Sequence, residues 1–167
     1  MKISDNGIKL LKQLEGCVKQ GDKHIIYDDK NGKPVNLNNP LPRGATIGYG
    51  HLIKNGEHFE NGIDEKQATE LLYTDVIMAE QAVQNNIIAP LTQNQYDALV
   101  LFAYNIGAKN FANSTVVKYV NNQKFQSKQY PTLESAWKAW NQSHGDISKG
   151  LTHRRSVEWN LYANDKV

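Results

Sequence analysis

The sequence predicts an α+β, mostly helical fold in which one short region forms β structure. Apolar residues recur every three or four positions along most of the 167-residue chain, which indicates amphipathic helices. Only residues 24–53 combine short apolar runs with Gly, Pro and Asn in the way that strands and turns do. Residues 96–106 are apolar nearly all round, which is typical of a helix at the centre of a core.

Capping patterns mark the expected helix starts. Ser4 can cap a first helix, and Gly16 offers it an end. Residues 64–67 resemble a capping box that opens a long amphipathic helix to residue 84, and residues 92–95 repeat this pattern before the central helix. Further helices are expected over residues 115–122, 133–141 and 152–162.

Composition and charge argue against several classes of protein. Hydrophobic residues make up 40% and charged residues 22%, which is ordinary for a globular protein, and no apolar run approaches the roughly 20 residues of a transmembrane helix. The first residues lack the pattern of a secretory signal, so we expect the chain to start in the cytosol. The net charge of +2, with scattered basic residues and no stacking-aromatic motif, gives no indication of nucleic-acid binding.

The single cysteine, Cys17, excludes an internal disulfide, and we interpret it as a small apolar filler. The histidines and carboxylates show no recognised ligand spacing, so no metal is expected.

Glu15 is the first candidate for chemistry, because helical spacing puts it on the same face as Ile8 and Leu11 near the end of the first helix. Apolar surroundings and the negative end of the helix dipole both favour a protonated acid. Such an acid is what a glycosidase needs to protonate a departing sugar oxygen. The alternative is an edge glutamate with a solvated tip.

Asp28 and Asp29 follow a short strand, where aspartates usually bond to the local backbone. A carboxylate facing Glu15 across a sugar-wide gap would instead be the second group of a two-carboxylate hydrolase.

The segment from residue 46 to residue 52, TIGYGHL, is read as a strand in which Thr46, Gly48 and Gly50 share one bare face. Strand glycines often mark the close approach of a ligand, so a sugar could lie against this face. A bend or bulge is the alternative.

Together these residues resemble the glutamate, aspartate and threonine set of the phage-type lysozymes, glycoside hydrolase family 24. The resemblance rests on Glu15-Gly16 at the end of the first helix, on residues 27–29 (YDD) and on residues 46–51 (TIGYGH). It continues through residues 91–99, 104–107, 137–140 and 150–158, and so covers nearly the whole chain.

The resemblance implies catalytic roles by motif position. Glu15 would be the general acid, Asp29 its carboxylate partner, and Thr46 would help to hold the attacking water of an inverting hydrolase. Asp28 is the alternative to Asp29.

The resemblance also implies supporting and binding residues. His51 would pair with Asp75 as structural support behind the site, with a role as catalytic base as the alternative. Leu52, Tyr104 and Asn105 match positions that face substrate, although packing or helix capping would also explain them.

Two further sets of side chains are given structural interpretations. The tryptophans are expected to pack in the core rather than to bind sugar: Trp137, Trp140 and Trp159. Arg154 and Arg155 are expected to form a salt-bridged or solvated face, with Glu158 as their partner.

The chain departs from the compact family spacing in two places. The stretch from Glu15 to Asp29 is longer, and residues 33–45 look like an insertion that either loops out or reshapes the cleft.

The resemblance implies a single two-lobed lysozyme domain over residues 1–167. A small β-hairpin lobe would cover about residues 15–63, a connecting helix about 64–84, and a larger helical lobe about 85–167 together with the N-terminal helix. The implied protein is a monomeric endolysin that needs no cofactor and does not insert into membranes. It would wait in the host cytoplasm and then hydrolyse the β-1,4 bond between N-acetylmuramic acid and N-acetylglucosamine in peptidoglycan glycan strands.

Three rival functions remain open. A lytic transglycosylase would cleave the same bond with one glutamate and no water, and the presence of both Asp29 and Thr46 favours hydrolysis instead. A non-catalytic peptidoglycan-binding module would keep the cleft without the chemistry. A secreted antibacterial lysozyme effector would share all the sequence features of an endolysin.

Overall fold

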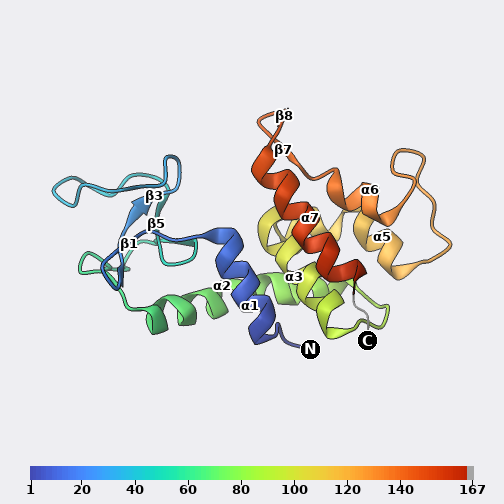
Figure 1. Ribbon diagram of the computed structural model, residues 1–167, viewed down its shortest axis with the longest axis horizontal. Helices are drawn as coiled ribbons and strands as arrows, with labels where there is room; N and C mark the ends of the chain where they lie inside the picture. The colour runs from blue at the N-terminus through green and yellow to red at the C-terminus, as the bar shows by residue number, and fades with distance from the viewer. Residues whose placement is uncertain (165–167) are drawn as a thin grey trace. The chain divides into compact units, whose positions relative to one another are not determined.

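The computed structural model describes residues 1–164, and the chain in it forms two compact units (Figure 1). One unit comprises residues 9–75, and the other comprises residues 1–8 with the chain from Val76 onward. Helices α1 (Asp5–Glu15) and α2 (Glu65–Asn86) each contribute to both units. The predicted α+β, mostly helical fold is confirmed.

The unit of residues 9–75 holds most of the β structure. A hairpin of β1 (Lys19–Gln20) and β2 (Lys23–His24) precedes a four-stranded antiparallel sheet. The sheet has the order β4-β3-β5-β6, with β3 over Tyr27–Asp28, β4 over Lys33–Pro34, β5 over Ala45–Ile47 and β6 over His51–Leu52. Its register pairs Tyr27 with Thr46 and Thr46 with Leu52.

Residues 46–52 are not one strand, so the single-strand interpretation is wrong and the bend is correct. The chain turns at Gly48-Tyr49-Gly50, and β5 and β6 pair with each other across that turn. Gly48 has a φ of 64° and Gly50 a φ of 88°, a region that residues with a side chain rarely adopt. The two glycines therefore serve the turn, and no bare strand face exists in this segment.

The predicted helix starts in this half of the chain are confirmed by their caps. Ser4 Oγ accepts a hydrogen bond from the Gly7 amide at 3.0 Å, and α1 ends before Gly16, whose φ is 66°. Before α2, the Gln67 amide donates to Asp64 Oδ1 at 2.7 Å, and the Asp64 amide donates to Gln67 Oε1 at 3.0 Å. Reciprocal bonds of this kind satisfy amides that the first helical turn leaves without partners.

The other unit is built around α3 (Gln93–Ile106), which begins with the predicted capping box at Thr92. The helices that follow are α4 (Ala108–Ala112), α5 (Thr115–Asn121), α6 (Leu133–Lys138) and α7 (Lys149–Ala163). Helix α3 packs against α7, and α6 contacts both α5 and α7 (Figure 1). Helix α4 and the hairpin of β7 (Gln142–Ser143) and β8 (Asp146–Ile147) were not predicted, because both are too short to show a period.

Aromatic side chains fill the core of this unit. Phe102, Phe111 and Trp137 are fully buried, and the Phe102 ring centre lies 4.9 Å from that of Trp137 and 6.1 Å from that of Phe111. Core packing of Trp137 is thus confirmed. Cys17 is exposed, so its interpretation as an apolar filler is wrong: it lies two residues beyond α1, outside the periodic run.

Candidate active site

Glu15 is the last residue of α1 and is half-buried. The next residue, Gly16, turns the chain away, and a Cβ built on Gly16 would meet no atom within 4 Å. The end of α1 therefore borders open space, which suits a side chain that must reach a ligand.

Asp28 and Asp29 differ in what their carboxylates do. Asp28 Oδ1 accepts the amide of Lys30 at 2.9 Å, which is the local turn bond that aspartates commonly make. The Asp29 carboxylate is exposed and has no hydrogen-bond or ion-pair partner within residues 1–164. Asp29 is therefore the one of the two whose side chain is available to a ligand.

Asp29 and Thr46 are held together by one carbonyl. The Asp29 amide donates to Gly44 O at 3.0 Å, and the Thr46 hydroxyl donates to the same oxygen at 2.8 Å. Gly44 has a φ of 91°, so this approach of the two strands depends on a glycine. Thr46 is 2% exposed, and its hydroxyl oxygen keeps lone pairs that can accept a hydrogen bond.

The charges of Glu15 and Asp29 both act on the buried phenol of Tyr27. Burial, together with the negative charges of Asp29 and Glu15, raises the pKa of Tyr27 to about 12, and a hydrogen bond from the Gly50 amide to the phenol oxygen opposes this rise. Both carboxylates therefore lie within electrostatic reach of one hydroxyl. At the level of sequence, Tyr27 was treated only as part of the YDD motif of residues 27–29. Its position directly before two aspartates was the available indication that it lies near the site.

His51 is bound by two carboxylates. Its Nδ1 lies 2.8 Å from Asp75 Oδ2, and its Nε2 lies 3.1 Å from Glu57. The hydrogen bond with Asp75 raises the pKa of His51, burial opposes this rise, and Glu57 adds to it. Both ring nitrogens are thus occupied, which leaves neither to act as a base. Sequence reasoning missed Glu57, which lies in the loop after β6 and carried no pattern.

Glu65, the first residue of α2, binds three neighbouring segments. Its carboxylate accepts from Lys12 of α1 at 3.0 Å, from the Tyr49 hydroxyl at 2.7 Å and from His24 at 2.8 Å. Burial opposes its ionisation, but these hydrogen bonds lower the pKa of Glu65 to about 2. Glu65 and its three partners thus hold α1 and the turn between β5 and β6 against the first turn of α2.

Leu52 is 58% exposed and borders a pocket of about 450 Å³ in the unit of residues 9–75. Residues 41–45 form one wall of this pocket, and residues 52–58 with Glu60 form the other. Residues 41–45 therefore shape a surface that includes Gly44, whose carbonyl binds both Asp29 and Thr46.

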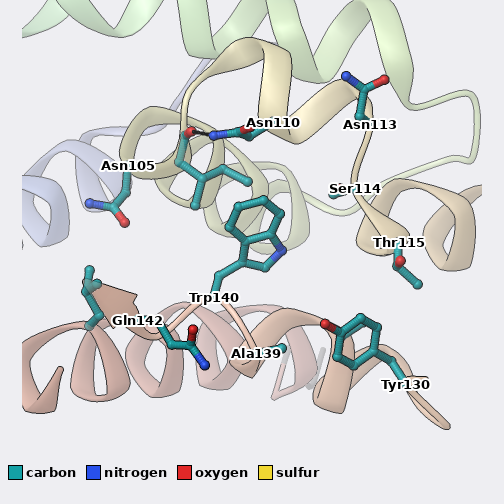
Figure 2. Close-up of a pocket in the computed structure, with 12 residues that line it drawn as sticks. Asn105, Asn110, Asn113, Ser114, Thr115, Tyr130, Ala139, Trp140 and Gln142 are labelled. Carbon is teal, nitrogen blue, oxygen red and sulfur yellow. Dashed lines mark hydrogen bonds between the residues drawn. The ribbon is translucent and has the colours of Figure 1, made fainter. Parts of the chain in front are cut away.

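A larger pocket, of about 680 Å³, lies in the helical unit and is shown in Figure 2. Trp140 extends into the middle of the view, with Asn105 at one side and Tyr130 at the other. Its lining contains no charged residue, and its polar groups are amides and hydroxyls: Asn105, Asn110, Asn113, Gln142, Ser114, Thr115 and Tyr130. Trp140 thus faces a cavity, contrary to the expectation that it only packs in the core. Tyr104 is half-buried and does not line the pocket.

Arg154, Arg155 and Glu158 are buried rather than forming a surface pair. Arg154 Nε lies 3.1 Å and Arg155 Nη2 lies 3.0 Å from Glu158 Oε2, and the indole N–H of Trp137 donates to Glu158 Oε1 at 3.1 Å. The salt bridge was predicted, but its burial was not, because α7 has apolar neighbours on more sides than its own sequence indicates.

No group of three or more His, Cys, Asp or Glu side chains within residues 1–164 is arranged to hold a metal ion. Within the same residues, no helix combines the length and the apolar character that crossing a bilayer requires.

Comparison with known sequences finds that the chain is similar to several phage proteins. Residues 12–158 match the phage lysozyme family. The chain is 35% identical to the endolysin of Salmonella phage P22 over 158 residues, which cover 93% of this chain and 94% of that protein. It is 32% and 34% identical to the endolysins of Bacillus phages PZA and B103 over 97% of its own length. The chain spans only about half of those two proteins, 55% and 54%.

Two solved structures have a similar fold. An endolysin from Escherichia coli O157:H7 phage FAHEc1 superposes with a TM-score of 0.73 at 30% identity, covering 99% of this chain and 96% of the other. The muramidase domain of SpmX from Asticaccaulis excentricus superposes with a TM-score of 0.72 at 30% identity, covering 97% of both chains.

Proposed function

Because the chain belongs to the phage lysozyme family, we propose that it is a muramidase, which hydrolyses the β-1,4 bond between N-acetylmuramic acid and N-acetylglucosamine in peptidoglycan. The observation that carries this proposal is that Asp29 and Thr46 share the Gly44 carbonyl, while the charges of Glu15 and Asp29 both act on the Tyr27 phenol. Two carboxylates and one hydroxyl are the groups that an inverting glycosidase uses.

Glu15 donates the proton in this mechanism. Its carboxyl group protonates the glycosidic oxygen as the bond to the sugar carbon breaks, and the leaving sugar departs as a neutral alcohol.

Asp29 and Thr46 act on the water molecule. The exposed Asp29 carboxylate accepts a proton from the water as its oxygen attacks the sugar carbon on the face opposite the leaving group. Thr46 gives its own proton to Gly44 O, so its oxygen accepts the second hydrogen of the water and orients it. The product is a reducing sugar of inverted configuration.

The pocket in the helical unit supports binding of a neutral, N-acetylated glycan. Amide and hydroxyl groups bond to acetamido and hydroxyl groups of sugars, and the face of Trp140 offers an apolar surface for a sugar ring. In the unit of residues 9–75, Leu52 contributes an exposed apolar contact.

The test is mass spectrometry of the fragments released from purified peptidoglycan by the wild type and by Glu15→Gln. Glu15→Gln keeps the size of the side chain but cannot donate the proton, so release is expected to fall by about 10²- to 10⁴-fold. Glu70→Gln, an exposed change on α2, is the matched control and should retain full activity.

Three outcomes are distinguishable. Reducing muramic-acid ends from the wild type, absent with Glu15→Gln, support hydrolysis. Anhydro ends would show a lytic transglycosylase, and no release by the wild type would show a binding module. Chromatography of the first products formed would show whether the new anomeric centre is inverted.

The biological role follows from the same chemistry. We expect an endolysin that acts on the wall for host lysis as a monomer, and the similarity to several phage endolysins supports this role over that of a secreted effector. Expression in cells with and without a membrane-permeabilising holin would test it: lysis only with the holin supports a cytoplasmic stage.

A further inference from the structure

Arg155, a buried arginine of α7, forms a hydrogen bond with Asn105 at the edge of the helical pocket. Arg155 is 1% exposed, and its Nη2 donates to Asn105 Oδ1 at 2.6 Å. Asn105 is exposed and borders the pocket in Figure 2. A fully buried cation therefore bonds directly to an amide that a ligand can reach.

The guanidinium group of Arg155 is itself held from several directions. Glu158, which is 0% exposed, lies 3.0 Å from Nη2, and the carbonyl of Trp140 lies 3.4 Å from Nη1. The ring of Phe102 lies below the group, with 5.2 Å from its centre to Cζ. The guanidinium group therefore has little freedom to move. The Asn105 side chain must adopt the orientation that keeps its hydrogen bond to Arg155.

The bond fixes which end of the Asn105 amide is offered to a ligand. An isolated asparagine side chain can present either its oxygen or its nitrogen. Arginine has five donors and no acceptor, so only Oδ1 of Asn105 can face it. The Nδ2 group then points away from Arg155 and bonds to no acceptor within residues 1–164.

We infer that Arg155 is a positioning residue that makes Asn105 a dedicated hydrogen-bond donor to a carbonyl oxygen of the substrate, the acetamido group of an N-acetylated sugar. This inference rests on the proposed function, because it takes the glycan as the ligand. It also gives a reason for burying an ion pair, which seldom stabilises a fold by itself: the pair determines the polarity of the binding surface.

The test measures binding rather than hydrolysis, so that it survives a failure of the proposed mechanism. Soluble peptidoglycan glycan strands, intact or chemically N-deacetylated, are titrated calorimetrically into the Glu15→Gln protein, which does not consume them. The intact strands are expected to bind more tightly. Asn105→Ala should weaken their binding by about three- to tenfold, the usual effect of one neutral hydrogen bond, and should remove the preference over deacetylated strands.

Asn105→Asp distinguishes donor from acceptor. The aspartate can still accept from Arg155, but it offers the ligand an oxygen, so it should bind intact strands no better than Asn105→Ala. Asn160→Ala, an exposed amide on α7 outside the pocket lining, is the matched control and should bind as the parent does.

Arg155→Lys tests the positioning role through a double-mutant cycle with Asn105→Ala. A lysine keeps the charge beside Glu158 but loses the planar group that reaches Asn105. We expect Arg155→Lys to weaken binding when Asn105 is present and to change it less than twofold when Asn105 is already alanine. Equal losses in both backgrounds, or a wild type without preference for acetylated strands, would overturn the inference.

A failure of the proposed hydrolysis would look different. The wild type would then release no reducing ends, whereas the binding differences between these variants would remain measurable.

Discussion

Replacing Asp75 by Asn removes the charge on one side of His51 while keeping the shape of the side chain. The carboxylate bonds to His51 Nδ1 at 2.8 Å, and the imidazole is almost fully buried. A hydrogen bond between charged groups contributes about 1.5–3 kcal/mol. Because Asp75 remains partly exposed, solvent screening reduces this value, and we expect a loss of about 1–2 kcal/mol. For a chain of this size that loss corresponds to roughly 2–8 °C in Tm.

The pH dependence of this loss identifies its cause. The pKa of His51 is raised in the folded protein, mainly by Asp75, above the value of 6.5 that it has when unfolded. A group of this kind stabilises the fold fully below its unfolded pKa, and the contribution is lost as pH rises through the folded pKa. The difference between wild type and Asp75→Asn should therefore be largest near pH 6 and clearly smaller at pH 9.

Urea unfolding at both pH values measures this difference, with Glu70→Gln on the same helix as a control for the loss of one negative charge. The pKa of Glu57 is lowered although burial opposes this, so pH 6 lies above its titration and Glu57 stays ionised throughout. An equal loss at pH 6 and pH 9 would refute the reasoning, because it would place the effect in packing rather than in the imidazolium pair.

Four other substitutions have expected outcomes. Asp29→Asn should lower the hydrolysis rate by about 10²-fold or more. Asp28→Asn should keep the rate and change stability by only about 0.5 kcal/mol or less, because the asparagine oxygen can still accept the Lys30 amide; initial rates and urea unfolding would show both. Phe102→Ala should cost about 3–5 kcal/mol in urea unfolding because it empties part of a closed core. Glu65→Gln should cost about 1 kcal/mol or less at pH 7, given its exposure. The pKa of Glu65 is about 2, so that loss should shrink as pH falls from about 4.5 towards 2.

Local signals in the sequence were sufficient for the helices and for part of the site. Capping boxes and glycine ends are interactions between residues three or four apart, so α1, α2 and α3 could be located from the sequence alone. The pairing of His51 with Asp75 came from the family resemblance, and the structure shows the contact. The segment of residues 46–52 was misread because a period of two also fits a tight turn whose glycines have positive φ.

The remaining features depend on contacts between residues far apart in the chain, which no local pattern encodes. Asp29 could be separated from Asp28 only when the structure showed that one carboxylate is committed to a turn and the other is exposed. Arg155 likewise resembled an ordinary surface arginine until its bond to Asn105, 50 positions away, was visible. In both cases the motif suggested the candidate residues, and the internal partner of each polar group distinguished between them. The Asp29 carboxylate is exposed and open to a ligand, whereas the Asn105 amide has one end bonded to the buried Arg155, which under our inference leaves its other end for the substrate.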